Sequence, residues 1–130
     1  MVYVADTHSV IWFLTEEYSK LGENAKRAFE NTENGQDIIV ISTISLMEIL
    51  YVCNKKGIIK QFEIILQKMK KSLNYIVFDL NLEIVKQCVE LEKVSEMHDR
   101  IIVATAKKLN APVITIDKNI KDSEYAKVVW

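Results

Sequence analysis

The sequence predicts a three-layer α/β/α sandwich built on a central, mainly parallel sheet. Three observations lead to this fold class. Short apolar runs alternate with longer segments in which apolar residues recur at helical spacing. The short runs are apolar along their whole length, which is typical of parallel strands covered on both faces. The helical segments stand between the strands and supply the right-handed crossovers that a parallel sheet requires.

Length and composition indicate one ordinary globular domain covering residues 1–130. A formal net charge of -1 argues against a uniformly basic surface that clamps duplex DNA, so any contact with nucleic acid must be local. No run approaches the ~18 apolar residues of a membrane span. Cys53 and Cys88 form neither a paired motif nor a metal-type spacing, which favours a reducing compartment. We therefore expect a cytoplasmic protein that contacts no membrane.

The N-terminal part begins with a strand at 2–5, a β-branched and aromatic run that stops at Asp6. Residues 8–14 carry apolar side chains at helical spacing and predict the first helix. Residues 23–32 place small and aromatic side chains on one face, and turn residues then end this second helix. A second buried strand is expected at 37–42.

The middle of the chain predicts two long helices, at 43–57 and 58–73, joined at a glycine as a helical hairpin. The apolar run at 75–78 predicts a third strand. Residues 82–94 again show helical spacing, so a further helix should follow.

The C-terminal part predicts a helix at 98–109, a strand at 112–116 and an apolar closing segment at 126–130. The polar residues between the last two segments are expected to form a surface segment without regular structure. The order of elements is then β-α-α-β-α-α-β-α-α-β-β.

Four carboxylates fall at positions that face one edge of this sheet. Asp6 and Asp117 each follow a strand directly, and Glu48 and Asp99 lie within the first two turns of helices. In open α/β sheets, ligands gather beyond the carboxyl ends of the strands. These four side chains are therefore the candidate site.

Each acid also has an ordinary structural explanation. Asp6 and Asp117 suit a helix cap or a turn, and Asp99 suits the positive end of a helix dipole. Glu48 stands in a helix whose neighbouring positions predict extensive burial, where a salt bridge to Arg100 is the alternative. The functional interpretation depends on the four acids meeting in space.

Carboxylates that converge repel one another unless a multivalent cation neutralises them. An all-oxygen ligand set favours Mg²⁺ or Mn²⁺ over Zn²⁺, and His8 and His98 are left out of the predicted site. Such ions activate water for displacement at phosphorus, so the sequence predicts phosphodiester hydrolysis.

The sequence resembles the PIN-domain ribonucleases, and among them the VapC-like toxins of bacterial toxin-antitoxin pairs. The resemblance rests on "ADTHSVIWFL", "STISLMEI", "HDRIIVATAKKLNAPVITIDKNI" and the closing "VVW", and it spans nearly the whole chain. It implies a PIN-like fold and hydrolysis of RNA by the four acids with Mg²⁺ or Mn²⁺. Thr115 matches a hydroxyl often seen near such sites. Asn119 stands where some relatives carry another acid, so one bound ion is expected.

The resemblance also implies a homodimer, a cognate antitoxin whose C-terminal segment occupies a groove near the site, and structured or messenger RNA as substrate. Lysines concentrated between residues 55 and 71 could contact RNA phosphates, or could simply form a solvated face. Two alternatives stay open. One is a noncatalytic PIN-like module that binds RNA or protein, and the other is a receiver-type phosphoacceptor domain, although only one acid, Asp6, follows the first strand.

Overall fold

The computed structural model describes residues 1–130 and contains one sheet of five parallel strands in the order β3-β2-β1-β4-β5. The strands are β1 (Val2–Ala5), β2 (Ile38–Ser42), β3 (Tyr75–Phe78), β4 (Val113–Ile114) and β5 (Val128–Val129). The helices are α1 (Thr7–Leu14), α2 (Glu23–Glu33), α3 (Thr43–Lys55), α4 (Ile59–Lys71), α5 (Leu82–Cys88), α6 (Met97–Leu109) and α7 (Lys118–Ser123), with a 3-10 helix at Tyr18–Lys20.

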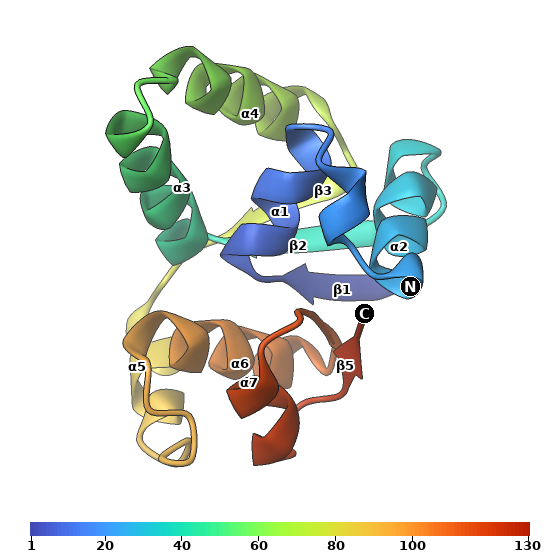
Figure 1. Cartoon of the computed structure of the whole chain (residues 1–130). Coiled ribbons are helices and arrows are strands. Elements are labelled where there is room, and N and C mark those ends of the chain that lie inside the picture. Colours follow the sequence, from blue (N-terminus) through green and yellow to red (C-terminus); the bar gives the residue numbers. More distant parts are fainter.

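Helices cover both faces of the sheet, which confirms the predicted three-layer fold. Figure 1 shows α1 to α4 on one side and α5 to α7 on the other. Successive side chains of β1 point to opposite faces of the sheet. Ala5 packs with Val10 and Phe29 in one layer, whereas Val4 packs with Ile102 in the other. None of the helices is both long enough and apolar enough to cross a membrane.

The central position of β1 determines where the site lies. Val4 pairs with Val40 of β2 on one side and with Val113 of β4 on the other. The chain following β1 and the chain following β4 therefore leave the sheet side by side, and Asp6 N donates to the Ile114 carbonyl at 3.1 Å. The carboxyl edge of these two strands is the floor of the candidate site.

The helix expected at 82–94 is shorter than predicted. It ends at Cys88, and the chain then turns so that Leu91 and Val94 enter the core beside Ile84. Val89 is largely exposed, so continuing the helix would bury no further apolar surface there. Leu91 and Val94 therefore continue the apolar spacing of a helix although they belong to a turn that is packed into the core.

A helix that the sequence did not predict, α7, follows β4. Its six residues are mostly polar, but Ile120 and Ser123 are buried on its inner side. The prediction of an irregular surface segment here was wrong, because burial of one isoleucine and a cap from Asp117 stabilise a helical turn that has little apolar periodicity. The strand before it is also shorter than the predicted 112–116.

Candidate active site

Asp6 is held rigidly at the end of β1 by two different hydrogen bonds. Its Oδ1 accepts from the Ser9 N–H at 2.9 Å and so caps α1. Its Oδ2 accepts from the Thr115 hydroxyl at 2.5 Å. The side chain is thus both a helix cap and part of the surface where β1 and β4 end, and the two interpretations of this aspartate are compatible.

Asp117 reaches the same place from β4. Its carboxylate accepts from the Ile120 N–H at 3.0 Å and caps α7, while its own N–H donates to the Thr115 hydroxyl at 2.9 Å. Thr115 is fully buried and therefore links the two aspartates through a single oxygen. This hydroxyl fixes their relative position, which gives the threonine a positioning role.

Glu48 approaches from α3. Its Oε1 accepts a hydrogen bond of 2.6 Å from the hydroxyl of Thr7, the first residue of α1. His98 Nδ1 lies 4.0 Å from Glu48 Oε2, and its principal partner is Glu96 Oε1 at 2.6 Å. The hydrogen bond to Glu96 raises the pKa of His98 above its ordinary value.

The expected burial around Glu48 was wrong, and the alternative role of this acid, a salt bridge to Arg100, is not observed. The helix is not largely buried, because Met47 and Tyr51 on its outer side are 48% and 69% exposed. No salt bridge forms with Arg100, whose Nε instead donates to the Val94 carbonyl at 2.7 Å. Arg100 therefore does not neutralise Glu48.

Asp99 is the acid with the most perturbed ionisation. It is the third residue of α6, and its N–H donates to Glu96 Oε2 at 2.8 Å, so the cap of this helix is Glu96. Burial, followed by repulsion from Asp117, Glu96, Asp6 and Glu48, raises the pKa of Asp99 to about 7. The like-charged neighbours place Asp99 within the electrostatic range of all three other predicted acids.

All four predicted acids line one cavity of about 420 Å³ at the carboxyl edge of the sheet. Asn119 is not among its lining residues and points from the exposed surface of α7. The cavity walls also contain Thr7, His8, Trp12, Glu96 and Ile116. The structure thus brings together acids that are spread from position 6 to position 117 of the chain.

The chemistry of this cavity fits a hard divalent cation. Its possible ligands are mainly carboxylate oxygens, with no thiolate, and the like-charge repulsion on Asp99 is a cost that a bound cation would offset. As the side chains are placed, no group of three or more His, Cys, Asp or Glu residues could hold a metal ion. The residues thus fit a divalent cation by donor type and by charge, and their present positions do not form its ligand shell.

Sequence reasoning missed two residues that shape the cavity. Thr7 supports Glu48, yet a threonine at a helix start is ordinary and gave no signal of a partner so distant in sequence. Glu96 stands just before α6, outside the helix predicted at 98–109. An acid close before the start of a predicted helix could have indicated that Glu96 caps it.

The fold and the acidic cavity together define an α/β domain with a carboxylate site at the carboxyl edge of its sheet. The family model described as PIN domain matches residues 3–124. The chain belongs to the PIN-domain family, and this assignment replaces the receiver-type alternative. No curated protein sequence matches the chain.

Several solved structures share the fold over nearly the whole chain. VapBC2 from Rickettsia felis, bound to a DNA fragment from its promoter, has a TM-score of 0.74 at 18% identity and is covered over 97% of its chain by 98% of this one. DNA-bound VapBC from Salmonella typhimurium gives 0.74 at 16% identity, with 98% of this chain and 96% of that chain covered. Mycobacterium tuberculosis VapC20, a sarcin-ricin loop cleaving toxin, gives 0.73 at 16% identity with both chains fully covered.

Melting curves can distinguish a cation site from four unrelated caps. We expect Mn²⁺ in large excess over its Kd to raise the Tm of the wild type by several degrees through ligand linkage. In EDTA at pH 8, Asp99→Asn should melt at the same temperature as the wild type or above it, and should show a smaller rise with Mn²⁺. The reason is that the raised pKa of Asp99 makes its ionised form unfavourable in the folded state.

The sign of this effect depends on pH. As the pH rises from about 4 to about 7, Asp99 ionises in the unfolded chain before it ionises in the folded chain. The wild type therefore loses free energy of unfolding over this range, and Asp99→Asn does not. A helix-dipole role alone predicts the opposite, a loss of up to about 1 kcal/mol in the variant with or without Mn²⁺. Equal destabilisation under both conditions would remove Asp99 from the site.

Proposed function

We propose that this protein is a divalent-metal-dependent endoribonuclease that hydrolyses RNA phosphodiester bonds. The observation that carries the proposal is the convergence of Asp6, Glu48, Asp99 and Asp117, from four separate segments, on one cavity. Membership of the PIN-domain family supports the same conclusion, as does the likeness of the fold to VapC20, a sarcin-ricin loop cleaving toxin.

The four acids are proposed as the ligands of Mg²⁺ or Mn²⁺. The bound ion would activate water and stabilise negative charge on the phosphate oxygens. Thr115 holds Asp6 and orients the backbone before Asp117, and Thr7 holds Glu48, so that the carboxylates are positioned before substrate binds. Asn119 lies outside the cavity, which is consistent with one bound ion.

The chain is further proposed to be the toxin of a toxin-antitoxin pair, with a cognate antitoxin as its protein partner. The support is the shared fold with the VapBC proteins of Rickettsia felis and Salmonella typhimurium. In a cytoplasmic setting, such a partner would restrain the nuclease by occupying a groove near the acidic cavity.

A homodimer is proposed because apolar side chains are left uncovered. Leu82 and Val85 of α5 and the adjacent Val89 recur at helical spacing and are 69%, 51% and 76% exposed, and α3 separately exposes Met47 and Tyr51. An exposed apolar stripe such as the one on α5 is characteristic of surfaces that a second chain covers. A second copy would bury them.

Cleavage of labelled RNA by the purified chain tests the proposal directly. We expect products with Mg²⁺ or Mn²⁺ and none in EDTA, because the proposed mechanism relies on the bound ion to activate water and to stabilise charge on the phosphate. Denaturing gel electrophoresis measures the products, and adding back Mn²⁺ after EDTA is the control. RNA that binds without cleavage under every metal condition would favour the noncatalytic module instead.

A further inference from the structure

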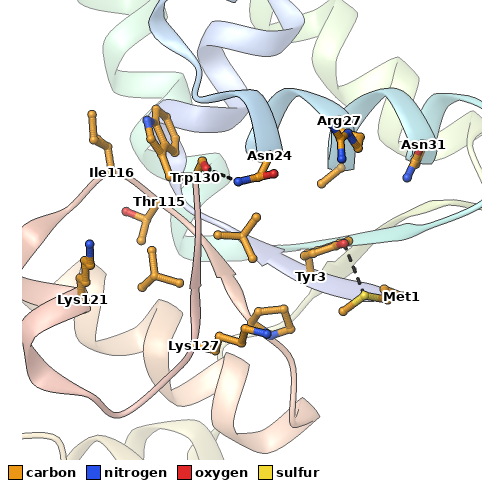
Figure 2. A pocket seen from close by; sticks show the side chains of 14 residues that line it. Met1, Tyr3, Asn24, Arg27, Asn31, Thr115, Ile116, Lys121, Lys127 and Trp130 are labelled. Atoms are coloured by element: carbon orange, nitrogen blue, oxygen red, sulfur yellow. Dashed lines mark hydrogen bonds between the residues drawn. The ribbon is translucent and has the colours of Figure 1, made fainter.

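A second and larger cavity, about 640 Å³ in volume, lies beside the acidic one and has the opposite charge. It is a groove between α2 and the last two strands of the sheet, and Figure 2 shows the side chains that line it. Arg27, Lys121 and Lys127 line the groove, whereas no Asp or Glu side chain does. On a chain with a net charge of -1, this is a local concentration of positive charge.

The basic side chains of this groove are available to a ligand. Lys121 and Lys127 are exposed and make no ion pair or hydrogen bond through their ammonium groups. Arg27 makes only a long contact of 3.5 Å with Glu23, and both of those side chains are largely in solvent. Such a contact contributes little, so the guanidinium can exchange it for a phosphate.

The groove meets the acidic cavity at a shared wall. Ile116 lines both and is 59% exposed, although it stands between the two buried or half-buried residues Thr115 and Asp117. Thr115 also belongs to both regions, because it lines the groove and hydrogen-bonds Asp6. The segment that ends β4 therefore separates a cation-attracting surface from an anion-attracting one.

Two tryptophans continue this shared wall. Trp12 lines the acidic cavity and Trp130 lines the groove, and their rings meet edge to face with centroids 6.0 Å apart. Both indoles are only half-buried. Trp130 is held in place because it lies directly over Gly22, where an added Cβ would come within 2.5 Å of the Trp130 ring. A fixed, partly exposed indole is a suitable surface on which an unpaired base can stack.

We propose that this groove is a subsite for single-stranded RNA, which holds the nucleotides next to the phosphodiester bond that enters the acidic cavity. The inference rests on the proposed ribonuclease function and adds the form of the substrate. Arg27, Lys121 and Lys127 contact the flanking phosphates, and Trp130 stacks on a base at the entrance to the cavity. A base in a duplex is already stacked and cannot use this indole, so the site selects an unpaired strand.

The test is the salt dependence of RNA binding by a double variant that removes two positive charges, Lys121→Gln with Lys127→Gln. Binding of a short, fluorescently labelled single-stranded RNA of mixed sequence is measured by anisotropy in EDTA, which prevents cleavage. We expect several-fold weaker binding and a slope of log Kd against log salt that is smaller by about 1.4, because each lysine that no longer neutralises a phosphate lowers the slope by about 0.7. In Mn²⁺, KM for the same RNA should rise while kcat changes little.

The matched control removes the same charge elsewhere. Lys60 and Lys70 are exposed lysines of α4, within the lysine-rich stretch between residues 55 and 71, and they line a different surface cavity. Lys60→Gln with Lys70→Gln should leave the salt slope and KM unchanged. An equal loss of affinity in both double variants would overturn the subsite, because binding would then depend on net charge, or on the lysines between residues 55 and 71, as much as on the groove.

A second variant addresses the indole. Trp130→Ala should weaken binding of the single-stranded RNA by about 5- to 150-fold, the usual range for removing one base-stacking partner, and should affect a duplex of the same sequence far less. Because Trp130 packs on Gly22, the Tm of this variant is measured alongside; the lysine variants give the decisive result if this variant unfolds.

The remaining outcomes separate the subsite from the ribonuclease function. Wild-type cleavage with no change in the Lys121 and Lys127 double variant would overturn the subsite and leave the nuclease standing. A wild type that neither binds nor cleaves RNA would overturn both. If the double variant bound RNA normally but lost affinity for a polyglutamate peptide, the groove would be a docking site for an acidic protein segment, and the RNA subsite would be wrong.

Discussion

Cleavage of RNA in Mn²⁺ should fall by at least about 100-fold in Asp6→Asn and in Asp117→Asn, because each change removes one negative ligand from the proposed ion. Asparagine is as good a helix cap as aspartate. Asp117→Asn should therefore keep the cap of α7 and melt close to the wild type in EDTA. Asp6→Asn can keep the cap of α1 but has no second oxygen to accept from the buried Thr115 hydroxyl, so it should melt at a lower temperature. At Asp117, the combination of abolished cleavage with retained stability distinguishes a ligand from a residue whose role is capping alone.

The matched control is Asp122→Asn, which removes an exposed carboxylate of α7 that lies outside the acidic cavity. It changes the net charge by the same amount and should cleave RNA at the wild-type rate. Initial rates on one labelled RNA at saturating Mn²⁺ make the comparison. Full activity in either Asp6→Asn or Asp117→Asn would remove that aspartate from the proposed site.

Expression of the wild-type chain alone in a bacterial host should stop growth, and expression of Asp99→Asn should not. The reason is that unrestrained cleavage of cellular RNA halts translation, whereas loss of one carboxylate from the cavity removes the activity. Colony counts after induction measure the effect, and immunoblots confirm equal soluble protein. Asp122→Asn should arrest growth like the wild type.

Harmless expression of soluble wild-type protein that cleaves RNA after purification would contradict the toxin role and leave the nuclease intact. Arrest by Asp99→Asn at equal protein level would show that the toxicity does not come from the acidic cavity. These two results test different parts of the proposed function.

The strands and the helical hairpin were predictable because their apolar residues follow one period over many positions. The end of α5 was not, since Leu91 and Val94 continue the helical spacing while Val89 turns outward. The helix α7 contains a single apolar residue, Ile120. Its formation depends on the burial of that residue among distant parts of the chain, which the local sequence does not indicate. Both misses are cases in which burial set by the whole fold overrides local periodicity.

The convergence of the four acids on one cavity was predictable from one rule, that ligands gather beyond the carboxyl ends of the strands. The side chains that support them were not. The hydrogen bonds from Thr7 to Glu48 and from Thr115 to Asp6 join residues 41 and 109 positions apart. Such pairs leave no mark on a single sequence. The positions of the acids are therefore easier to predict than the hydroxyl groups that hold them.

Insertion of β4 between β1 and β5 has a consequence for the order of events during synthesis of the chain. Asp6 emerges from the ribosome early, but its hydrogen-bond partner Thr115 and its neighbour Asp117 are made more than 100 residues later. A nascent chain that has formed only β1, β2 and β3 lacks half of the acidic cavity. The four carboxylates can therefore meet only after the chain has been synthesised through Asp117, so a shorter nascent chain does not contain the complete cavity.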